Sequence, residues 1–138
     1  AGFPSYIKEI KQLGVISFET WVKDSSTNYF GTDDFKTSSL PKYTDLVIAD
    51  HVEKEKFAAY LKIHQQGETD YFTFCRHCAE TGIVKWIVSL EKMTCTYFDK
   101  DEKEILEEKM WDVILYKKKL FCKLTCCFQI FILVQISI

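Results

Sequence analysis

Apolar and polar residues follow one pattern twice along the chain, a helical spacing and then a strand-like alternation. Residues 5–14 and 71–82 place apolar side chains three and four positions apart, and a glycine that can close a helix ends each stretch. Residues 15–31 and 83–99 then alternate in two runs around a polar turn, which is typical of a β-hairpin. The pattern therefore predicts a helix followed by a β-hairpin in each half of the chain.

A third helix is predicted between these halves. Asp50 and Glu53 have the spacing of a capping box, which predicts a helix that runs through Gln66 and ends at Gly67. Ser5 is expected to cap the first helix in a similar way. Residues 35–48 are expected to be extended and irregular, and the charged residues 100–109 to form a solvated helix or turn.

The two halves align without a gap at a constant offset of 68 residues. Residues 3–33 fall on residues 71–101 with four identities in 31 positions, and the helical stripe, the closing glycine and the strand phase all agree. We therefore expect an α+β fold in which duplicated helix–β-hairpin units surround an antiparallel sheet, with an additional helix between the copies. The helices are expected to cover one face of that sheet.

Charge divides the chain into an acidic body and a basic, apolar end. Residues 1–109 hold 14 Lys and Arg against 19 Asp and Glu, whereas residues 110–138 hold four Lys against one Asp. The body is predicted to be a single α+β domain, and its acidity argues against a nucleic-acid partner. Residues 110–138 are predicted to be an extension outside this domain.

The extension has two open interpretations. Residues 120–138 are almost entirely apolar, but Lys123, Gln129 and Gln135 weaken the case for a membrane anchor. A membrane contact is therefore unexpected except through residues 120–138, and self-association through the extension is a further expectation. An out-of-frame origin explains the same composition at least as well as a functional segment.

Six cysteines are unevenly distributed, three in the body and three in the extension. An odd number in a body of this size argues against a disulfide scaffold, and the opening AGFPSYIKEI lacks the features of a secretion signal. We expect a reduced, cytoplasmic protein.

The stretch CRHC raises three possibilities: a metal site, a redox pair or a buried helix face. Cys75 and Cys78 are the candidate metal ligands, but the body has no second paired motif to complete a tetrahedral zinc site. A redox pair belongs at a helix N-terminus, where the dipole lowers the thiol pKa. Cys75 and Cys78 instead align with Ile7 and Ile10 of the first half, which favours a buried face.

No catalytic motif or phosphate-binding loop is found, and no cofactor is predicted. We expect a non-catalytic binding or accessory protein. The alternative is a small thiol- or histidine-dependent enzyme that uses the candidate residues His64, Cys75 and Cys95. Several aromatic residues could line a pocket, although such residues usually belong to a core: Trp21, Trp86, Tyr97, Phe98 and Trp111.

Two stretches, HQQGETDYFTFC and VKWIVSLEKMTCTYFDK, resemble the YdfO/YbcV-like bacterial and prophage proteins, a family often labelled "phage envelope protein". With supporting stretches such as FPSYIKEIKQLGV and SFETWV, the resemblance covers about residues 3–109. It implies a small α+β fold and no established activity, catalytic residue or cofactor. The partner is expected to be an unknown protein or small molecule. Members of this family usually carry a further N-terminal helix, and they end near Glu108.

Overall fold

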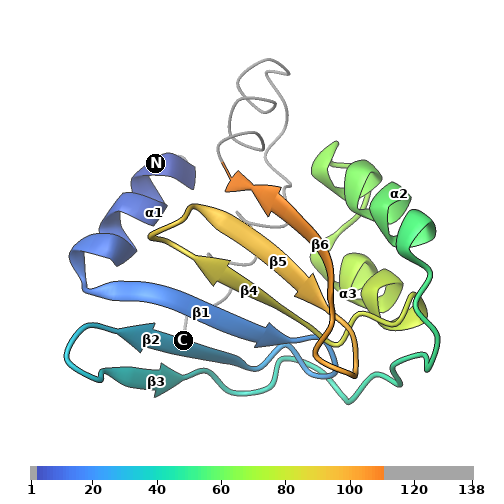
Figure 1. The fold of residues 1–138 in the computed structure, drawn as a ribbon, viewed down its shortest axis with the longest axis horizontal. Coiled ribbons are helices and arrows are strands. Elements are labelled where there is room, and N and C mark those ends of the chain that lie inside the picture. The colour runs from blue at the N-terminus through green and yellow to red at the C-terminus, as the bar shows by residue number, and fades with distance from the viewer. Residues whose placement is uncertain (1–2, 111–138) are drawn as a thin grey trace.

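The computed structural model describes residues 3–110, which form an antiparallel sheet with helices on one side of it (Figure 1). The helices are α1 (Phe3–Gln12), α2 (Lys54–Gln65) and α3 (Tyr71–Glu80). The strands are β1 (Val15–Trp21), β2 (Thr27–Gly31), β3 (Lys36–Ser38), β4 (Lys85–Ser89), β5 (Thr94–Phe98) and β6 (Glu104–Lys109). Their order across the six-stranded sheet is β3-β2-β1-β4-β5-β6, so the α+β class is confirmed.

The two predicted hairpins have the same strand register. Phe18 lies opposite Tyr29 in the β1–β2 hairpin, and Trp86 lies opposite Tyr97 in the β4–β5 hairpin, which is the same pair 68 residues later. The two hairpins meet at the centre of the sheet, where β1 pairs antiparallel with β4. Each half thus contributes a helix and three strands in the same order.

The backbone repeats its special conformations at the same spacing. Gly14 and Gly82 have φ angles of 91° and 85°, as expected of glycines that close a helix in the left-handed region. Four of the five non-glycine residues with positive φ form two pairs 68 residues apart, Ser25 with Met93 and Asp34 with Glu102, whereas Asp33 has no such counterpart. The turns of the two halves therefore share these positive φ angles although their side chains differ.

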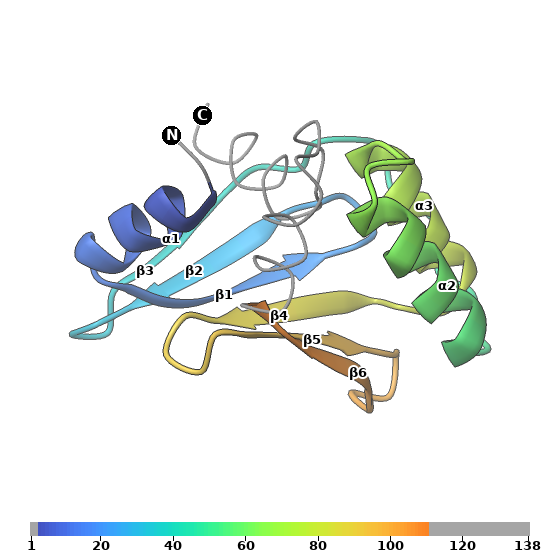
Figure 2. The ribbon, with the colours of Figure 1, turned by 90° about the horizontal axis from the view of Figure 1, so that it is seen from above.

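All three described helices lie on the same side of the sheet (Figure 2). Alternation within the strands sends one set of side chains toward the helices. The core that results is rich in aromatic rings, and its largest fully buried side chains include Phe18, Phe57, Phe74, Trp86 and Tyr97. None of the described helices covers the opposite face of the sheet.

Two predicted helix starts are wrong. Helix α2 begins at Lys54, with Glu53 as its N-cap residue and no side-chain hydrogen bond at the cap. The carboxylate of Asp50 instead bonds to Lys100 Nζ at 2.5 Å, so this distant lysine competes with the predicted capping box. Helix α1 begins at Phe3, which places Ser5 inside the helix.

The charged residues 100–109 were predicted to form a solvated helix or turn, and this prediction is also wrong for most of them. They include β6, an edge strand that pairs with β5. Ile105 is 8% exposed, and Leu106 packs against the core. One face of this edge strand is exposed to solvent and carries acidic residues, so its sequence resembles that of a solvated helix.

Residues 39–53 connect β3 to α2 along the end of the sheet, without regular secondary structure. Backbone hydrogen bonds fix this connection to both layers, among them Leu46 N–H to Lys23 O at 2.7 Å and Ala49 N–H to Ala79 O at 2.8 Å. A β-carbon at Gly82 would lie 2.7 Å from the carbonyl oxygen of His51, so the close approach here requires glycine. Of the predicted extension, residues 110–138, the structure describes only Met110, which is buried in the core. Residues 111–138 lie outside the described residues.

Candidate functional site

The cysteines predicted as site candidates lie in the core. Cys75 and Cys78 on α3 and Cys95 on β5 are each 0% exposed, so the prediction that CRHC forms a buried helix face is confirmed. Burial raises the pKa of Cys75 to about 11, although hydrogen bonds with Tyr43 and Tyr71 act in the opposite direction. Burial also raises the pKa of Cys78. Thiols with such pKa values are protonated at neutral pH and are poor nucleophiles and metal ligands.

His64, the other candidate of the enzyme hypothesis, is also fully buried. Its Nδ1 atom lies 2.8 Å from the hydroxyl of Thr69, and its ring stacks on Phe74 with 4.5 Å between ring centres. These are the contacts of a core histidine, and they support a structural role. In the described part of the chain, His, Cys, Asp and Glu side chains form no group of three that could hold a metal ion.

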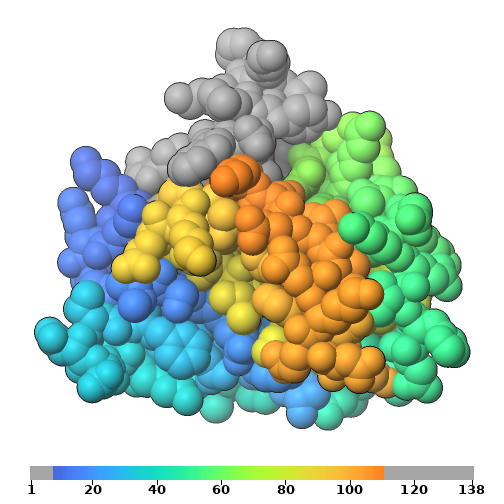
Figure 3. All heavy atoms as spheres, in the orientation of Figure 1, coloured from blue at the N-terminus to red at the C-terminus, as the bar shows by residue number. Residues whose placement is uncertain are grey.

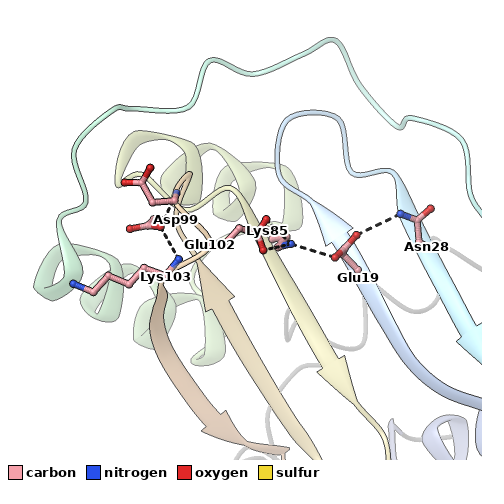
Figure 4. Close-up of polar contacts among 7 residues, drawn as sticks. Glu19, Asn28, Lys85, Asp99, Glu102 and Lys103 are labelled. Atoms are coloured by element: carbon pink, nitrogen blue, oxygen red, sulfur yellow. Dashed lines mark hydrogen bonds and ion pairs between the residues drawn. The ribbon is translucent and has the colours of Figure 1, made fainter.

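A charged cluster lies on the face of the sheet that no described helix covers, the face at the front of Figure 3. We call it the Lys85 cluster, and it consists of Glu19, Asn28, Lys85 and Glu102 (Figure 4). Lys85 Nζ lies 3.3 Å from Glu19 Oε2 and 3.0 Å from each carboxylate oxygen of Glu102. Asn28 Nδ2 donates a longer hydrogen bond, 3.4 Å, to Glu19 Oε1. The cluster thus links β2, β1 and β4 to the turn before β6.

Two aromatic rings enclose the same ammonium group. Lys85 Nζ lies 4.9 Å from the ring centre of Trp21 and 5.6 Å from that of Phe98. Burial by itself would lower the pKa of Lys85, but the hydrogen bonds and the attraction of Glu102 and Glu19 outweigh it and raise the pKa above its usual value. Lys85 is therefore a charged ammonium at neutral pH, held by carboxylates and by ring faces.

A cavity of about 480 Å³ adjoins this cluster. Asn28 belongs to both, and the ring of Trp21, which contacts Lys85, forms part of the cavity wall. Its walls come from the end of the β1–β2 hairpin, from the connection between β3 and α2, and from the residue before β4. The lining residues are Trp21, Lys23, Asp24, Ser26, Asn28, Ile48 and Val84. Its volume falls within the range of pockets that take small ligands, and it combines an aromatic wall with hydroxyl, amide and charged groups.

Only part of this site is predicted by the sequence patterns. Trp21 and Phe98 are two of the aromatic residues that the sequence offers for a pocket wall, and both contact the ammonium of Lys85. Trp86 and Tyr97 are core residues, 2% and 0% exposed, and Trp111 lies outside the described residues. Glu19, Lys85 and Glu102 were missed because they are far apart in the chain and only the sheet register brings them together.

Comparison with known proteins assigns the chain to a family. A family described as "Protein of unknown function (DUF1398)" matches residues 1–109. The chain belongs to this family. The family's description names no activity.

Two similar proteins come from mycobacteria. The "Uncharacterized protein Rv2012" of Mycobacterium tuberculosis (strain ATCC 25618 / H37Rv) is 23% identical over 108 residues, which are 77% of this chain. The "Uncharacterized protein Mb2035" of Mycobacterium bovis (strain ATCC BAA-935 / AF2122/97) matches to the same extent. In both comparisons the match spans 65% of the relative's own length. No helix among the described residues has the length and apolar character needed to cross a membrane.

Proposed function

We propose that this DUF1398 protein is a non-catalytic binding or accessory protein, and that it takes a small molecule into the cavity beside Trp21. The observation that carries the proposal is the position of Trp21. One strand residue contributes an aromatic wall to an open cavity and at the same time contacts the ammonium of Lys85. An aromatic wall surrounded by a few polar groups is the usual composition of a small-ligand site.

The chemistry of the thiols supports binding over catalysis. The alternative, an enzyme that uses Cys75, Cys95 and His64, needs an accessible thiol with a lowered pKa. Cys75 instead has a raised pKa and no exposed surface, and His64 is bonded to Thr69. None of these three residues is among those that line the cavity.

The proposal is tested by screening the full chain against a library of small polar and aromatic molecules, with melting temperature and native mass spectrometry as readouts. At least one compound is expected to bind the wild-type protein and to bind the variants Trp21→Ala and Lys23→Glu more weakly. Leu40→Ala is the matched control, because Leu40 is 71% exposed and does not line the cavity. Compounds that bind all four proteins equally would show that the cavity is not the site.

Three further points are proposals of the same kind. We infer that the two halves arose by duplication, which the shared register and the repeated positive φ angles support. The resemblance to prophage proteins supports a bacterial or prophage origin. The thiols of Cys75 and Cys78, which form no disulfide among the described residues, support a reducing, cytoplasmic location.

A further inference from the structure

The two carboxylates that contact Lys85, those of Glu19 and Glu102, differ in their exposure to solvent. Glu19 belongs to the central strand β1, and its side chain is 18% exposed. Glu102 lies in the turn between β5 and β6, and its side chain is 68% exposed. An ion pair with so exposed a partner contributes little to stability, because water competes for both charges. Glu102 can therefore leave Lys85 at low cost, whereas Glu19 cannot.

The turn that carries Glu102 does not depend on this ion pair. Asp99 Oδ1 accepts hydrogen bonds from the N–H groups of Asp101 and Lys103, each at 2.9 Å (Figure 4). The backbone N–H of Glu102 also donates to the carbonyl of Asp99 at 3.2 Å. The backbone is fixed by Asp99, so the side chain of Glu102 can rotate away while the turn keeps its shape.

Lys85, in contrast, cannot follow Glu102 into solvent. Its side chain is 7% exposed and is enclosed by Glu19 and by the rings of Trp21 and Phe98. If Glu102 leaves, the ammonium needs another anion to replace the lost hydrogen bonds. A carboxylate brought by a ligand restores the same charge balance, one buried cation with two carboxylates.

Only one half of the molecule has this arrangement. At the offset of 68, Lys85 corresponds to Ser17, Glu19 to Ile87 and Trp21 to Ser89. Glu102 corresponds to Asp34, which has the same positive φ angle but no lysine at the matching position. The shared positive φ angle therefore belongs to the fold, whereas the lysine, its carboxylates and the tryptophan are particular to this site.

We propose that the ligand of the Trp21 cavity is a small carboxylate whose anionic group replaces Glu102 on the ammonium of Lys85. The rest of the ligand packs on the indole of Trp21 inside the cavity. Glu102 then acts as an internal competitor that occupies the anion position when the ligand is absent. This inference rests on the binding function proposed above and names the class of ligand for it.

The test uses three probes of similar shape and different charge: benzoate, benzamide and benzylammonium. Each is titrated into the ¹⁵N-labelled full chain, and the amide signals of residues 84–86 and 100–103 and the indole signal of Trp21 are followed. Glu102→Gln is expected to strengthen benzoate binding about fivefold, because it removes the competing carboxylate. Glu104→Gln is the matched control, because it removes the same charge two residues away from an exposed position that has no bond to Lys85.

Benzoate is expected to bind Glu102→Gln more tightly than benzamide does, and benzylammonium to bind most weakly. Lys85→Met is expected to abolish the preference for benzoate; should that variant not fold, the comparison of the three probes on Glu102→Gln decides. Equal affinities of benzoate for Glu102→Gln and Glu104→Gln would overturn the inference, as would stronger binding of benzylammonium. If library compounds without an anionic group bind at Trp21 while benzoate does not, the proposed function stands and this inference falls.

Discussion

Tyr97 on β5 donates a hydrogen bond at 3.1 Å to the carboxylate of Glu108 on β6. The other oxygen of Glu108 accepts a hydrogen bond from Gln65 on α2 at 2.6 Å. Burial raises the pKa of Glu108 to about 7, although both hydrogen bonds lower it. The folded protein therefore holds a proton on this carboxyl at pH values where the unfolded chain has lost it.

This shift makes stability fall as the pH rises. Below the unfolded pKa of about 4.5 the carboxyl of Glu108 is protonated in both the folded and the unfolded state. Between pH 4.5 and 7 the free energy of unfolding falls progressively, because the unfolded chain loses this proton more readily. The loss is complete above pH 7 and amounts to roughly 3 kcal/mol. Glu108→Gln should abolish this slope and raise the free energy of unfolding at pH 8, as measured by urea denaturation from pH 4.5 to 8. An unchanged slope in the variant would assign the pH dependence to other groups.

The buried cysteines should contribute through packing. Cys78→Ala is expected to lower the free energy of unfolding by about 1 kcal/mol, since it removes one buried sulfur atom and leaves a small cavity. Urea denaturation of the variant and the wild type measures the difference. Stoichiometric zinc in wild-type protein purified without added metal would contradict a packing role for Cys75 and Cys78.

Gly14 and Gly82 are a matched pair of positions for measuring how much the close approach between Gly82 and the backbone of His51 restricts substitution. Both have positive φ, so alanine is strained at either position, by about 1–2 kcal/mol. At Gly14 the new β-carbon would meet only the hydroxyl of Thr32 at 3.3 Å, whereas at Gly82 it would meet the backbone of His51 at 2.7 Å. Gly82→Ala should therefore destabilise the protein clearly more than Gly14→Ala in thermal unfolding. Equal losses would mean that residues 39–53 move aside without cost.

The extension should be dispensable for the stability of the domain. Met110 is fully buried, and its N–H donates to the carbonyl of Met93 at 2.8 Å. We expect a chain truncated after Met110 to keep its melting temperature and gain solubility, because it loses the apolar residues 120–138. Truncation after Lys109 serves as the comparison and should lower the melting temperature. A chain ending at Met110 that fails to fold would show that residues 111–138 are structural.

Local sequence patterns were sufficient to predict the helix–hairpin units. They were insufficient where the structure depends on contacts between residues far apart in the chain. Gly14 and Gly82 mark helix ends by their own backbone preference, and the alternation around Phe18 and Trp86 follows from one-sided burial. Asp50 shows the limit, because its bond to Lys100 depends on the tertiary fold. The Lys85 cluster shows the same limit, since its members approach one another only through the pairing of β1 with β4.

That central pairing also bears on how the chain folds. Within each hairpin, paired residues such as Phe18 and Tyr29 are close in sequence, so the search for contact is short. The β1–β4 seam instead joins Phe18 to Val88 across most of the described chain, and its closure has the larger entropic cost. We expect the two hairpins to form early and the seam to close late, so that Glu19 and Lys85 meet in the last steps of folding.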